Sequence, residues 1–594
     1  MSNTSFEKIR KLIGQGEYLS AYDSAISQAE QANDNEAFHY LAVLSLARSG
    51  ATTRAQTLFN EFGFADSDNE DYAALGARLS KDLALANTNK NERITLFKKS
   101  ATQYHDVFMR TGGYYTAINA ASLYKLSNNN ELAKQLANET LALCKQEPVG
   151  LGLGEYYRLV SMAEAVIVLN DLETAKSLLT SARKHAGNDY AAMATTRRQL
   201  ALLIPEQHTV LLSVLAPPKV IHFCGHMISR TNNSGRFLPK AEQAVKKAIV
   251  KNLAALNVGF GYGSLANGAD ILFAEALLEQ GARLHVVLPF DMDEFIEVSV
   301  KPAGEKWVAR FHRCIDQAHF VSYSCDGSYL GDNTLFHYAT RLGMGLAVQQ
   351  AHNLQTEVKQ VAVWDGETAS GAAGTYADIQ SWQLQNHDAI LLSSVNGEHL
   401  SAPAKQAIVY TELDNSQRRA HAMLFGDVKG FSKLNDEQIP AFVKQLFGAL
   451  AEVLESFDSS ILSTNTWGDG LFVVFEDALS ASQCAIALQE AMQNIDLGDA
   501  GLPSHLALRL GVHYGPIYEL EDPVLHRTNY FGAHVTKAAR IEPITPEGEV
   551  YVTRQLAAEL ALNNSEFTTE YVGIMPTAKK YGDMPMYLLR ASST

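Results

Sequence analysis

The sequence predicts three domains of different fold class: an all-α helical repeat, an α/β domain with a parallel sheet, and an α+β domain of βαββαβ order. Three observations lead to this prediction. Turn residues and small residues recur at a 34-residue offset near the start of the chain, and strands, glycine-rich turns and helices alternate in the middle. The last third has the strand and helix order of a βαββαβ unit. Because 594 residues far exceed what one hydrophobic core organises, several domains are expected.

The composition is that of a soluble globular protein, with 46% apolar and 19% charged residues. A formal net charge of −16 argues against nucleic acid or an anionic membrane as a partner, because both require a basic surface. The five cysteines are scattered and lack the spacing of a zinc site, which predicts a reduced, cytoplasmic protein. The N-terminus lacks an apolar signal segment, and no apolar run has the length of a membrane span.

Residues 1–215 read as helices with small residues at their crossings. A turn residue followed five residues later by alanine recurs at Gly16/Ala21, Gly50/Ala55, Asn128/Ala133 and Asn170/Ala175. Glycine or asparagine tolerates a tight turn between helices, and alanine lets the next helix approach closely. The offset of 34 residues resembles the tetratricopeptide repeat, which implies a regulatory scaffold with a protein partner. The alternative is a helical bundle without a repeat.

The sequence pattern changes from helical to mixed strand and helix at Pro217-Pro218, which we take as the start of a second domain over residues 216–395. A buried strand over 219–226 and a helix over 241–256 precede a glycine-rich turn over 259–270. A further helix and strand follow, over 271–280 and 283–290. This order predicts a doubly wound, Rossmann-like parallel sheet, in which glycines at the strand ends let backbone N–H groups approach a phosphate or ribose.

Three motifs in this domain, at residues 225–227, 266–276 and 363–367, resemble the SLOG group of Rossmann-like domains, related to the LOG and DprA proteins. The resemblance implies that the domain senses a small nucleotide-like ligand. The residues that would form this second ligand site are Gly225, His226, Gly263, Ser264, Asn267, Gly268, Asp270 and Glu275. Two alternatives stay open: the acidic residues only stabilise a helix N-terminus, or the domain is itself an enzyme on a nucleotide or glycosidic bond with Glu275 as acid or base.

Residues 396–420 are polar and without a sustained period, and we interpret them as a linker. The third domain, residues 421–594, begins with a strand over 422–425 and a long helix with one apolar face. A hairpin turn at Gly468-Asp469, a helix over 478–492 and a strand over 505–513 complete a ferredoxin-like βαββαβ unit.

Asp427 ends the first strand of this unit, and Asp469 lies in the turn of the hairpin expected beside it. Two carboxylates on neighbouring strands repel each other, so a pair of divalent ions is a natural reason to place them there. Two Mg²⁺ or Mn²⁺ ions in such a site would lower the pKa of an attacking hydroxyl and neutralise a leaving pyrophosphate. Gly426 and Gly430 would keep the following turn open enough for backbone N–H groups to hold phosphate oxygens. The alternative for Asp469 is that it only stabilises the hairpin turn, because Asp-Gly sequences are common in turns.

Four motifs, at residues 425–432, 468–470, 509–516 and 532–540, resemble the class III nucleotidyl cyclases in the same order. The resemblance implies that Asp427 and Asp469 bind the two metal ions, with the backbone carbonyl of Val428 as a further ligand. It places the phosphates at Gly430 and Phe431. Because active sites of this family form between two such domains, a homodimer is implied.

The resemblance also implies three residues for the transition state and the triphosphate. Arg540 matches the arginine that stabilises the transition state from the partner subunit, and Thr536 stands where the family usually has asparagine. Lys579 best matches the lysine that holds the triphosphate, with Lys580 one position away as the alternative.

The two base-reading positions are Asn465 and Asn529, where adenylate and guanylate cyclases have other residues. An asparagine amide donates and accepts hydrogen bonds, so these residues do not select a base. We expect an adenylate cyclase, with GTP or a pyrimidine nucleotide as alternative substrates. The rival from another class is a catalytically weak or inactive cyclase-like domain that serves for dimerisation or nucleotide sensing. In either case the upstream domains are expected to regulate it.

Overall fold

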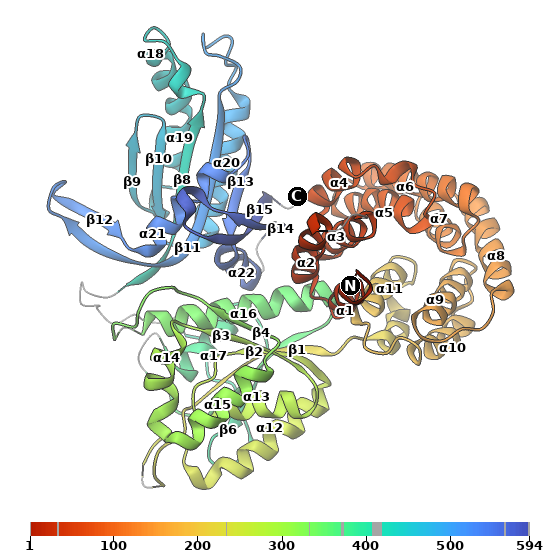
Figure 1. Ribbon diagram of the computed structural model, residues 1–594, viewed down its shortest axis with the longest axis horizontal. Coiled ribbons are helices and arrows are strands. Elements are labelled where there is room, and N and C mark those ends of the chain that lie inside the picture. Colours follow the sequence, from red (N-terminus) through yellow and green to blue (C-terminus); the bar gives the residue numbers. More distant parts are fainter. Residues whose placement is uncertain are drawn as a thin grey trace.

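The computed structural model describes residues 2–31, 35–232, 234–331, 333–369, 373–406, 418–563 and 566–591. Three lobes follow one another along the chain: a helical lobe, a central α/β lobe and a C-terminal α+β lobe (Figure 1). This is the order of fold classes that the sequence predicts. Within the described ranges no helix is long and apolar enough to cross a membrane.

Eleven α-helices build the first lobe, with the even-numbered helices α4 to α10 outside and the odd-numbered helices inside (Figure 1). Their bounds are Ser2–Gly14 (α1), Tyr18–Gln31 (α2), Glu36–Ser49 (α3), Thr52–Glu61 (α4), Glu70–Ala86 (α5), Lys90–Thr111 (α6), Tyr114–Leu126 (α7), Asn130–Gln146 (α8), Gly152–Val168 (α9), Leu172–Arg183 (α10) and Tyr190–Ala201 (α11). A 3₁₀ segment, Glu206–Leu215, leads to the second lobe.

The expected repeat is confirmed at its turns. Each of the four expected turn residues has a left-handed backbone, with φ of 78°, 87°, 65° and 69° at Gly16, Gly50, Asn128 and Asn170. The alanine five positions after each turn is buried, at 0–1% exposure, in Ala21, Ala55, Ala133 and Ala175. Side chains larger than a methyl group at these alanines would separate the paired helices.

The helical lobe closes on itself, and we call it the ring. Helix α1 contacts α11, although the two lie at opposite ends of the lobe in sequence. Gly14 at the end of α1 lies so close to Asp189, which caps α11, that a Cβ on Gly14 would stand 2.9 Å from the Asp189 carboxylate. The ring is therefore a closed structure and not an open solenoid.

The central lobe is a seven-stranded sheet of order β4-β3-β2-β1-β5-β6-β7, parallel except for β7. Its strands are Lys219–Gly225 (β1), Val258–Gly263 (β2), Arg283–Leu288 (β3), Phe320–Tyr323 (β4), Val358–Trp364 (β5), Ala389–Ser393 (β6) and His399–Leu400 (β7). Helices α12 (Glu242–Leu256), α13 (Ala269–Glu279) and α15 (Glu305–Gln317) cover one face, and α16 (Thr334–Leu354) and α17 (Thr375–Leu384) the other (Figure 1). The predicted doubly wound arrangement is confirmed.

The glycine-rich stretch over 259–270 differs from its prediction. Its first half is not a turn but the buried strand β2, and only residues 264–268 connect that strand to α13. A Cβ on Gly261 would lie 2.3 Å from Leu277 Cδ1, so this glycine lets α13 pack directly on the sheet. The sequence signal was misread because glycine for close packing and glycine for a turn look alike.

The predicted linker 396–420 contains the short strand β7, which pairs with β6, and the start of the next strand. Residues 407–417 of it lie outside the described residues. The linker is therefore partly built into the two flanking lobes.

The C-terminal lobe contains an eight-stranded sheet of order β14-β15-β13-β11-β8-β10-β9, with β12 paired to the end of β11. Its strands are Arg419–Lys429 (β8), Ile461–Trp467 (β9), Gly470–Phe475 (β10), Ala507–Asp522 (β11), Arg527–Phe531 (β12), Val550–Thr553 (β13), Phe567–Pro576 (β14) and Asp583–Ala591 (β15). Its helices are α18 (Ile439–Ala441), a π-helical segment (Phe442–Phe447), α19 (Gly448–Ser456), α20 (Ala478–Asn494), α21 (Ala533–Ala538) and α22 (Arg554–Leu562). The βαββαβ order from β8 to β11 is confirmed.

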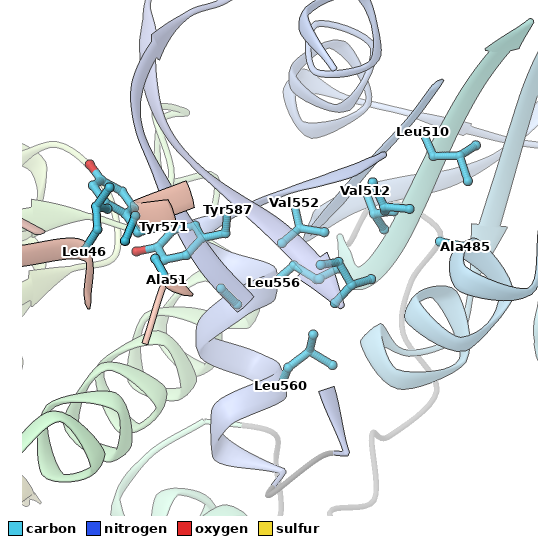
Figure 2. Close-up of a cluster of buried hydrophobic side chains, with 14 of the residues drawn as sticks. Leu46, Ala51, Ala485, Leu510, Val512, Val552, Leu556, Leu560, Tyr571 and Tyr587 are labelled. Carbon is cyan, nitrogen blue, oxygen red and sulfur yellow. The ribbon is translucent and has the colours of Figure 1, made fainter. Parts of the chain in front are cut away.

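The ring and the C-terminal lobe share one hydrophobic cluster, shown in Figure 2. Tyr571 and Tyr587 on β14 and β15 link Leu46 and Ala51 of the ring to the C-terminal core. Tyr571 is 2% and Tyr587 3% exposed, and Tyr571 also donates a hydrogen bond of 2.7 Å to Asp23 of α2. An apolar contact continuous with a domain core favours a fixed relation between the two lobes.

The central and C-terminal lobes meet through α16 and α22. Gly345 of α16 lies directly against Ala558 of α22. One turn earlier on α16, Arg341 donates a hydrogen bond of 3.0 Å to Glu559 of α22. Tyr338 donates a hydrogen bond of 2.7 Å to the backbone oxygen of Tyr514. All three lobes are thus in mutual contact.

Candidate active site

Strand pairing brings Asp427 and Asp469 together. Asp427 of β8 stands opposite Gly470 of β10, and Asp469 directly precedes Gly470 in the β9–β10 turn. Gly468 supplies the left-handed backbone of that turn, with φ of 66°. The two carboxylates therefore face the same end of the sheet, as the sequence predicts.

Electrostatics at this position favour a bound cation. Burial raises the pKa of the Asp469 carboxyl, and the neighbouring Asp427 carboxylate raises it further. On the other side of Asp427, Arg509 of β11 places Nη2 2.5 Å from its Oδ2 and 2.9 Å from Glu542 Oε1. Burial raises the pKa of Glu542 to about 7. Three acidic groups thus share one arginine.

The donor set fits divalent metal ions. Two carboxylates at hydrogen-bonding separation repel each other, and an oxygen-seeking ion such as Mg²⁺ or Mn²⁺ between them removes the repulsion. Val428, whose carbonyl is the expected further ligand, lies beside Asp427 in the β8–β11 ladder. Among the described residues no group of three His, Cys, Asp or Glu side chains suits a metal, so the remaining ligands would come from substrate and water.

The expected phosphate loop lies next to these carboxylates. Gly430 has φ of 95° and opens a 3₁₀ turn over Phe431–Lys433. The Phe431 ring packs on Phe442 at 4.8 Å between centroids and lies near Gly468 of the β9–β10 turn. A Cβ on Gly430 would lie 2.8 Å from the His505 ring, so the loop needs glycine for both its backbone angle and its space.

Thr536, Arg540 and Lys579 form a second group. Thr536 is exposed on the short helix α21, and Arg540 follows that helix. The backbone N–H of Ala578 donates a hydrogen bond of 3.4 Å to the Arg540 oxygen, which brings the Lys579 loop beside Arg540. Lys579 is exposed and has φ of 57°. The side chain of Lys580, the alternative, lies outside the described residues.

The two groups are not bonded to each other directly within the described residues of one chain. In the described parts of the chain, no hydrogen bond or ion pair links Arg540 to Asp427 or Asp469. Asp427 instead bonds Arg509, from within its own sheet.

The base-reading candidates Asn465 and Asn529 each have a partner that the sequence did not suggest. Asn465 of β9 accepts a hydrogen bond from Arg527 of β12 through its Oδ1. Asn529 of β12 donates a hydrogen bond of 2.9 Å from Nδ2 to Asp522 at the end of β11. The structure therefore brings both asparagines to facing hairpins and fixes which amide atom of each is used.

The family model described as "Adenylate and Guanylate cyclase catalytic domain" matches residues 414–591. Residues 414–591 are a class III adenylate/guanylate cyclase domain. A second family model, "Tetratricopeptide Repeats-Sensor", matches residues 21–124, in the ring.

Curated relatives resemble parts of the chain. Putative adenylate cyclase 3 of Rhizobium meliloti (strain 1021) is 34% identical over 145 residues, which cover 24% of this chain and 23% of that protein. Putative serine/threonine-protein kinase/receptor R818 of Acanthamoeba polyphaga mimivirus is 22% identical over 231 residues, or 36% of this chain and 13% of that protein. The chain thus spans less than a quarter of the length of either relative.

Solved cyclase structures are similar to part of the chain. The adenylyl cyclase CyaB from P. aeruginosa is 19% identical, with 30% of this chain and 96% of that chain covered and a TM-score of 0.27. The guanylyl cyclase Cya2 is 23% identical, with 30% and 93% covered and a TM-score of 0.26.

Sequence reasoning missed two residues of the cyclase domain that contact the candidate metal site, Arg509 and Glu542. Arg509 stands opposite Asp427 in the β8–β11 ladder, so its register in the sheet was the available signal. Glu542 lies two residues after Arg540, and only the fold brings it to Arg509.

Helix α21 of the cyclase domain also contacts the central lobe. Lys537 forms an ion pair of 2.9 Å with Asp326, and His534 Nε2 lies 3.3 Å from Cys325 Sγ. On its other side, His534 Nδ1 lies 2.7 Å from His513 Nε2 in β11. Burial lowers the pKa values of His513 and His534, so both imidazole rings are neutral. The helix that carries Thr536 is thereby attached to the lobe upstream of it.

The second candidate site lies where the strand order of the central sheet reverses, at the carboxyl ends of β1 and β5. His226, after β1, is 3.1 Å from Asp365 after β5 and 3.2 Å from Thr375 at the start of α17. Asp270 at the start of α13 is buried, and burial raises its pKa to about 7. Among the described residues, Asp270 Oδ1 and the Ser264 hydroxyl have no hydrogen-bond partner of normal geometry, although the Gly225 backbone lies near the Asp270 carboxyl.

Sequence reasoning missed Asp378 of α17, which is 8% exposed. Burial, followed by repulsion from Asp270, raises its pKa to about 8. Two buried acids therefore stand close together beside the end of β1.

Three predicted residues of this second site have structural partners instead. Asn267 bonds the backbone of Ser299 and Ile228, and Gly268 has φ of 93°, with no room for a Cβ beside Ile228. Glu275 does not join the group, because it forms a two-pronged ion pair with Arg310 of α15 at 2.7 Å. Its pKa is lowered although burial alone would raise it, and it is engaged as a structural ion.

Proposed function

We propose that the chain is a class III nucleotidyl cyclase that converts ATP to a 3′,5′-cyclic nucleotide and pyrophosphate. The 3′-hydroxyl of the substrate attacks its own α-phosphate. A P–O bond forms, the bond to the β-phosphate bridge breaks, and the hydroxyl proton is released. The observation that carries this proposal is the adjacency of Asp427 and Asp469 in a domain of this family.

Each group of residues has a part in this reaction. Asp427 and Asp469 would hold two Mg²⁺ or Mn²⁺ ions, which would supply Lewis acidity at the hydroxyl and the phosphates. The backbone after Gly430 binds phosphate oxygens, and Lys579 holds the triphosphate. Arg540 offsets the charge that develops at the α-phosphate, and Thr536 donates a hydrogen bond beside it.

The fixed orientation of the two asparagines supports adenine over guanine. With its Oδ1 held by Arg527, Asn465 offers its Nδ2 as a donor. Asn529 donates from its Nδ2 to Asp522, and its Oδ1, which already accepts a hydrogen bond of 2.9 Å from the Tyr530 N–H, keeps a second lone pair for an incoming donor. In the positions that the family uses, this pattern matches N1 and the amino group of adenine and opposes the reversed edge of guanine. Cytosine presents the same edge as adenine, so CTP is the closest competitor.

A homodimer, which the resemblance to the cyclase family implies, would let Arg540 act from the partner subunit, since among the described residues Arg540 has no direct bond to Asp427 or Asp469 of its own chain. Apolar side chains are exposed on the two hairpins beside the site: Trp467 at 55%, Leu525 at 49%, Leu520 at 39% and Phe531 at 38%. Contact with a second copy would bury them.

The deciding experiment incubates purified full-length protein with Mn²⁺ or Mg²⁺ and each of ATP, GTP, CTP and UTP. Products are identified by mass spectrometry. We expect cyclic AMP as the main product and its loss by at least about 100-fold in Asp469→Ala. No cyclic nucleotide from any substrate, or product unaffected by Asp469→Ala, would overturn the proposal and favour a non-catalytic nucleotide sensor.

Mixing two inactive variants tests the shared active site. Asp469→Ala and Arg540→Ala are each expected to be inactive, but a mixed dimer contains one intact site. We expect an equal mixture to recover about a quarter of wild-type activity, because half of random dimers are mixed and each has one of two sites. Recovery of no activity by a mixture that sedimentation shows to be dimeric would contradict the shared site.

We further infer that the central lobe binds a small nucleotide-like ligand at the carboxyl ends of β1 and β5. The unpartnered Asp270 Oδ1 and Ser264 hydroxyl support this inference, since buried polar atoms without partners are rare. A thermal-shift screen of nucleosides and nucleotides, with Asp270→Asn as the control, tests it. Stabilisation that is equal in the variant and the wild type would contradict it.

A further inference from the structure

The inner side of the ring carries a group of cationic and tyrosine side chains that the proposed cyclase reaction does not use. They come from seven helices spread around the ring, and we call them the central cluster. The cluster consists of the cations Arg48, Arg78, Lys81 and Arg198, and of Tyr18, Tyr40, Tyr104, Tyr115 and Tyr157. Figure 1 shows that the inner helices surround one centre.

Contacts across the ring show that these side chains meet at its centre. Lys81 of α5 donates a hydrogen bond of 2.9 Å to Gln199 of α11, which in turn donates one of 2.8 Å to Glu164 of α9. Tyr157 of α9 bonds Arg48 of α3. These helices lie far apart along the chain, and side-chain contacts connect them across the centre of the ring.

The centre is accessible to solvent although protein encloses it. Tyr157 and Tyr115 are 37% and 36% exposed, while Tyr104 beside them is 1% exposed. Protein surrounds the hydroxyls of both exposed tyrosines, and this burial raises the pKa of Tyr115 to about 12. The exposed faces of these rings therefore point into the ring and not to the outside of the molecule.

Among the described residues, most cations of the central cluster have no direct ion pair, although Asp82 lies near Lys81 and Arg198, and Asp189 lies near Arg48. Arg78 is paired with Asp82 at 3.5 Å, but within the described residues no carboxylate forms an ion pair with Arg48, Lys81 or Arg198. Arg48 Nε is buried and has no hydrogen-bond partner. Burial lowers the pKa of Lys81 to about 8, which the nearby Asp82 carboxylate opposes only in part. Glu164 accepts hydrogen bonds from Ser122 and Gln199, and burial raises its pKa.

We propose that the centre of the ring is a binding site for a small phosphorylated ligand that carries an aromatic base. Guanidinium groups recognise phosphate through paired hydrogen bonds, which Arg48 and Arg198 would supply. The exposed ring faces of Tyr115 and Tyr157 suit the stacking of a base. An extended peptide does not fit this site, because the contact between α1 and α11 closes the ring.

A ligand at this site would act on the cyclase domain through a direct contact. Tyr18 lies on α2, and Tyr40 and Arg48 lie on α3, and both helices pack on β14. Strand β14 leads into the loop that carries Lys579. Binding at the ring centre thus has a short structural path to the triphosphate-binding lysine.

The test measures binding of the fluorescent nucleotide trinitrophenyl-ATP to the full-length protein in EDTA. Without divalent ions the candidate cyclase site is not expected to hold a triphosphate, so this binding is independent of the proposed reaction. We expect saturable binding that Arg48→Gln and Arg198→Gln each weaken at least about tenfold. Arg110→Gln, an exposed arginine on the outer helix α6, should leave the affinity within about twofold.

Hydrogen exchange of the wild type locates the site without any substitution. We expect the probe to protect α3, α9 and α11, and protection confined to β8 and β10 would overturn the proposal. The absence of saturable binding would also overturn it, as would equal affinities of Arg48→Gln, Arg198→Gln and Arg110→Gln. Melting temperatures of the variants separate loss of binding from loss of folding, and the wild-type exchange data stand if a variant fails to fold.

Discussion

Glu570 of the cyclase domain accepts hydrogen bonds from the backbone N–H and the hydroxyl of Thr53 in the ring, at 3.0 and 3.1 Å. Thr53 is the second residue of α4, and the N-cap residue of that helix, Ala51, has no side chain that could cap it. Glu570 therefore supplies from another domain the acceptor that a serine or aspartate normally supplies from within the helix. Through this contact and the shared hydrophobic cluster, the ring stabilises the cyclase domain.

Replacing Glu570 by alanine should destabilise the protein. The substitution leaves the first N–H groups of α4 without an acceptor in a buried contact, at a cost of about 1–2 kcal/mol. Urea denaturation followed by fluorescence measures this loss. Glu570→Gln keeps one acceptor oxygen and should lose less. The exposed neighbour Glu566→Ala should lose nothing, and an equal loss there would show that the cap has no special role.

The contact between α16 and α22 depends on Gly345. A Cβ at this position would lie 2.1 Å from the backbone oxygen of Ala558, so Gly345→Ala must push the central lobe and the cyclase domain apart. Gly343 on the same helix is a matched control, because a Cβ there would meet nothing closer than 3.7 Å.

We expect Gly345→Ala to cost about 1–3 kcal/mol of stability through overpacking. Gly343→Ala should gain up to about 1 kcal/mol, because alanine favours a helix over glycine. Thermal unfolding of both variants measures the difference. Equal melting temperatures of Gly345→Ala and Gly343→Ala would mean that moving the two lobes apart costs no free energy of unfolding.

Much of the fold follows from local sequence patterns. The turn residues Gly16, Gly50, Asn128 and Asn170 marked the ring's repeat because tight turns need a left-handed backbone. The pairing of Asp427 with the hairpin turn of Asp469 followed from the βαββαβ order and short-range turn chemistry.

Features that depend on contacts between distant residues could not be predicted in this way. Arg527 and Asp522 orient the two base-reading asparagines only because β9 lies near the β11–β12 hairpin. Glu275 looked like a free acid at a helix start, and its partner Arg310 is 35 residues away. Closure of the ring also arises from a contact between the two ends of a helical lobe, which no local period encodes.

The orientation of Asn465 predicts a specific effect of Arg527 on base selection. Arg527→Ala frees the Asn465 amide to rotate, so it can accept from guanine as readily as it donates to adenine. We expect the ratio of kcat/KM for ATP over GTP to fall about tenfold, equal to about 1.4 kcal/mol. Thr528→Ala, an exposed neighbour on β12, is the control and should leave the ratio unchanged. An unchanged ratio in Arg527→Ala would show that the base is read elsewhere.

Stability of the central lobe should depend on pH through Asp378. Its pKa is raised from 3.8 to about 8 by burial and by Asp270, so the folded lobe binds a proton that the unfolded chain releases near pH 4. The stability associated with this proton is fully present below pH 4 and is lost as pH rises through about 8. The groups that face Asp378 are Asp270 on α13, Cys224 on β1 and Thr340 on α16. Burial raises the pKa of Asp270 to about 7, so Asp270 titrates in the same window, whereas the pKa of Cys224 is raised well above 9.

Asp378→Asn keeps the shape of the side chain and removes the titration. The variant should therefore melt with less dependence on pH between 6 and 9 than the wild type, and at pH 9 it should be more stable by about 1–2 kcal/mol. Melting temperatures across this pH range, compared with those of the exposed control Asp316→Asn, measure the effect. Parallel pH curves for the wild type and Asp378→Asn would mean that Asp378 is ionised in the folded protein, with a counter-ion that balances it.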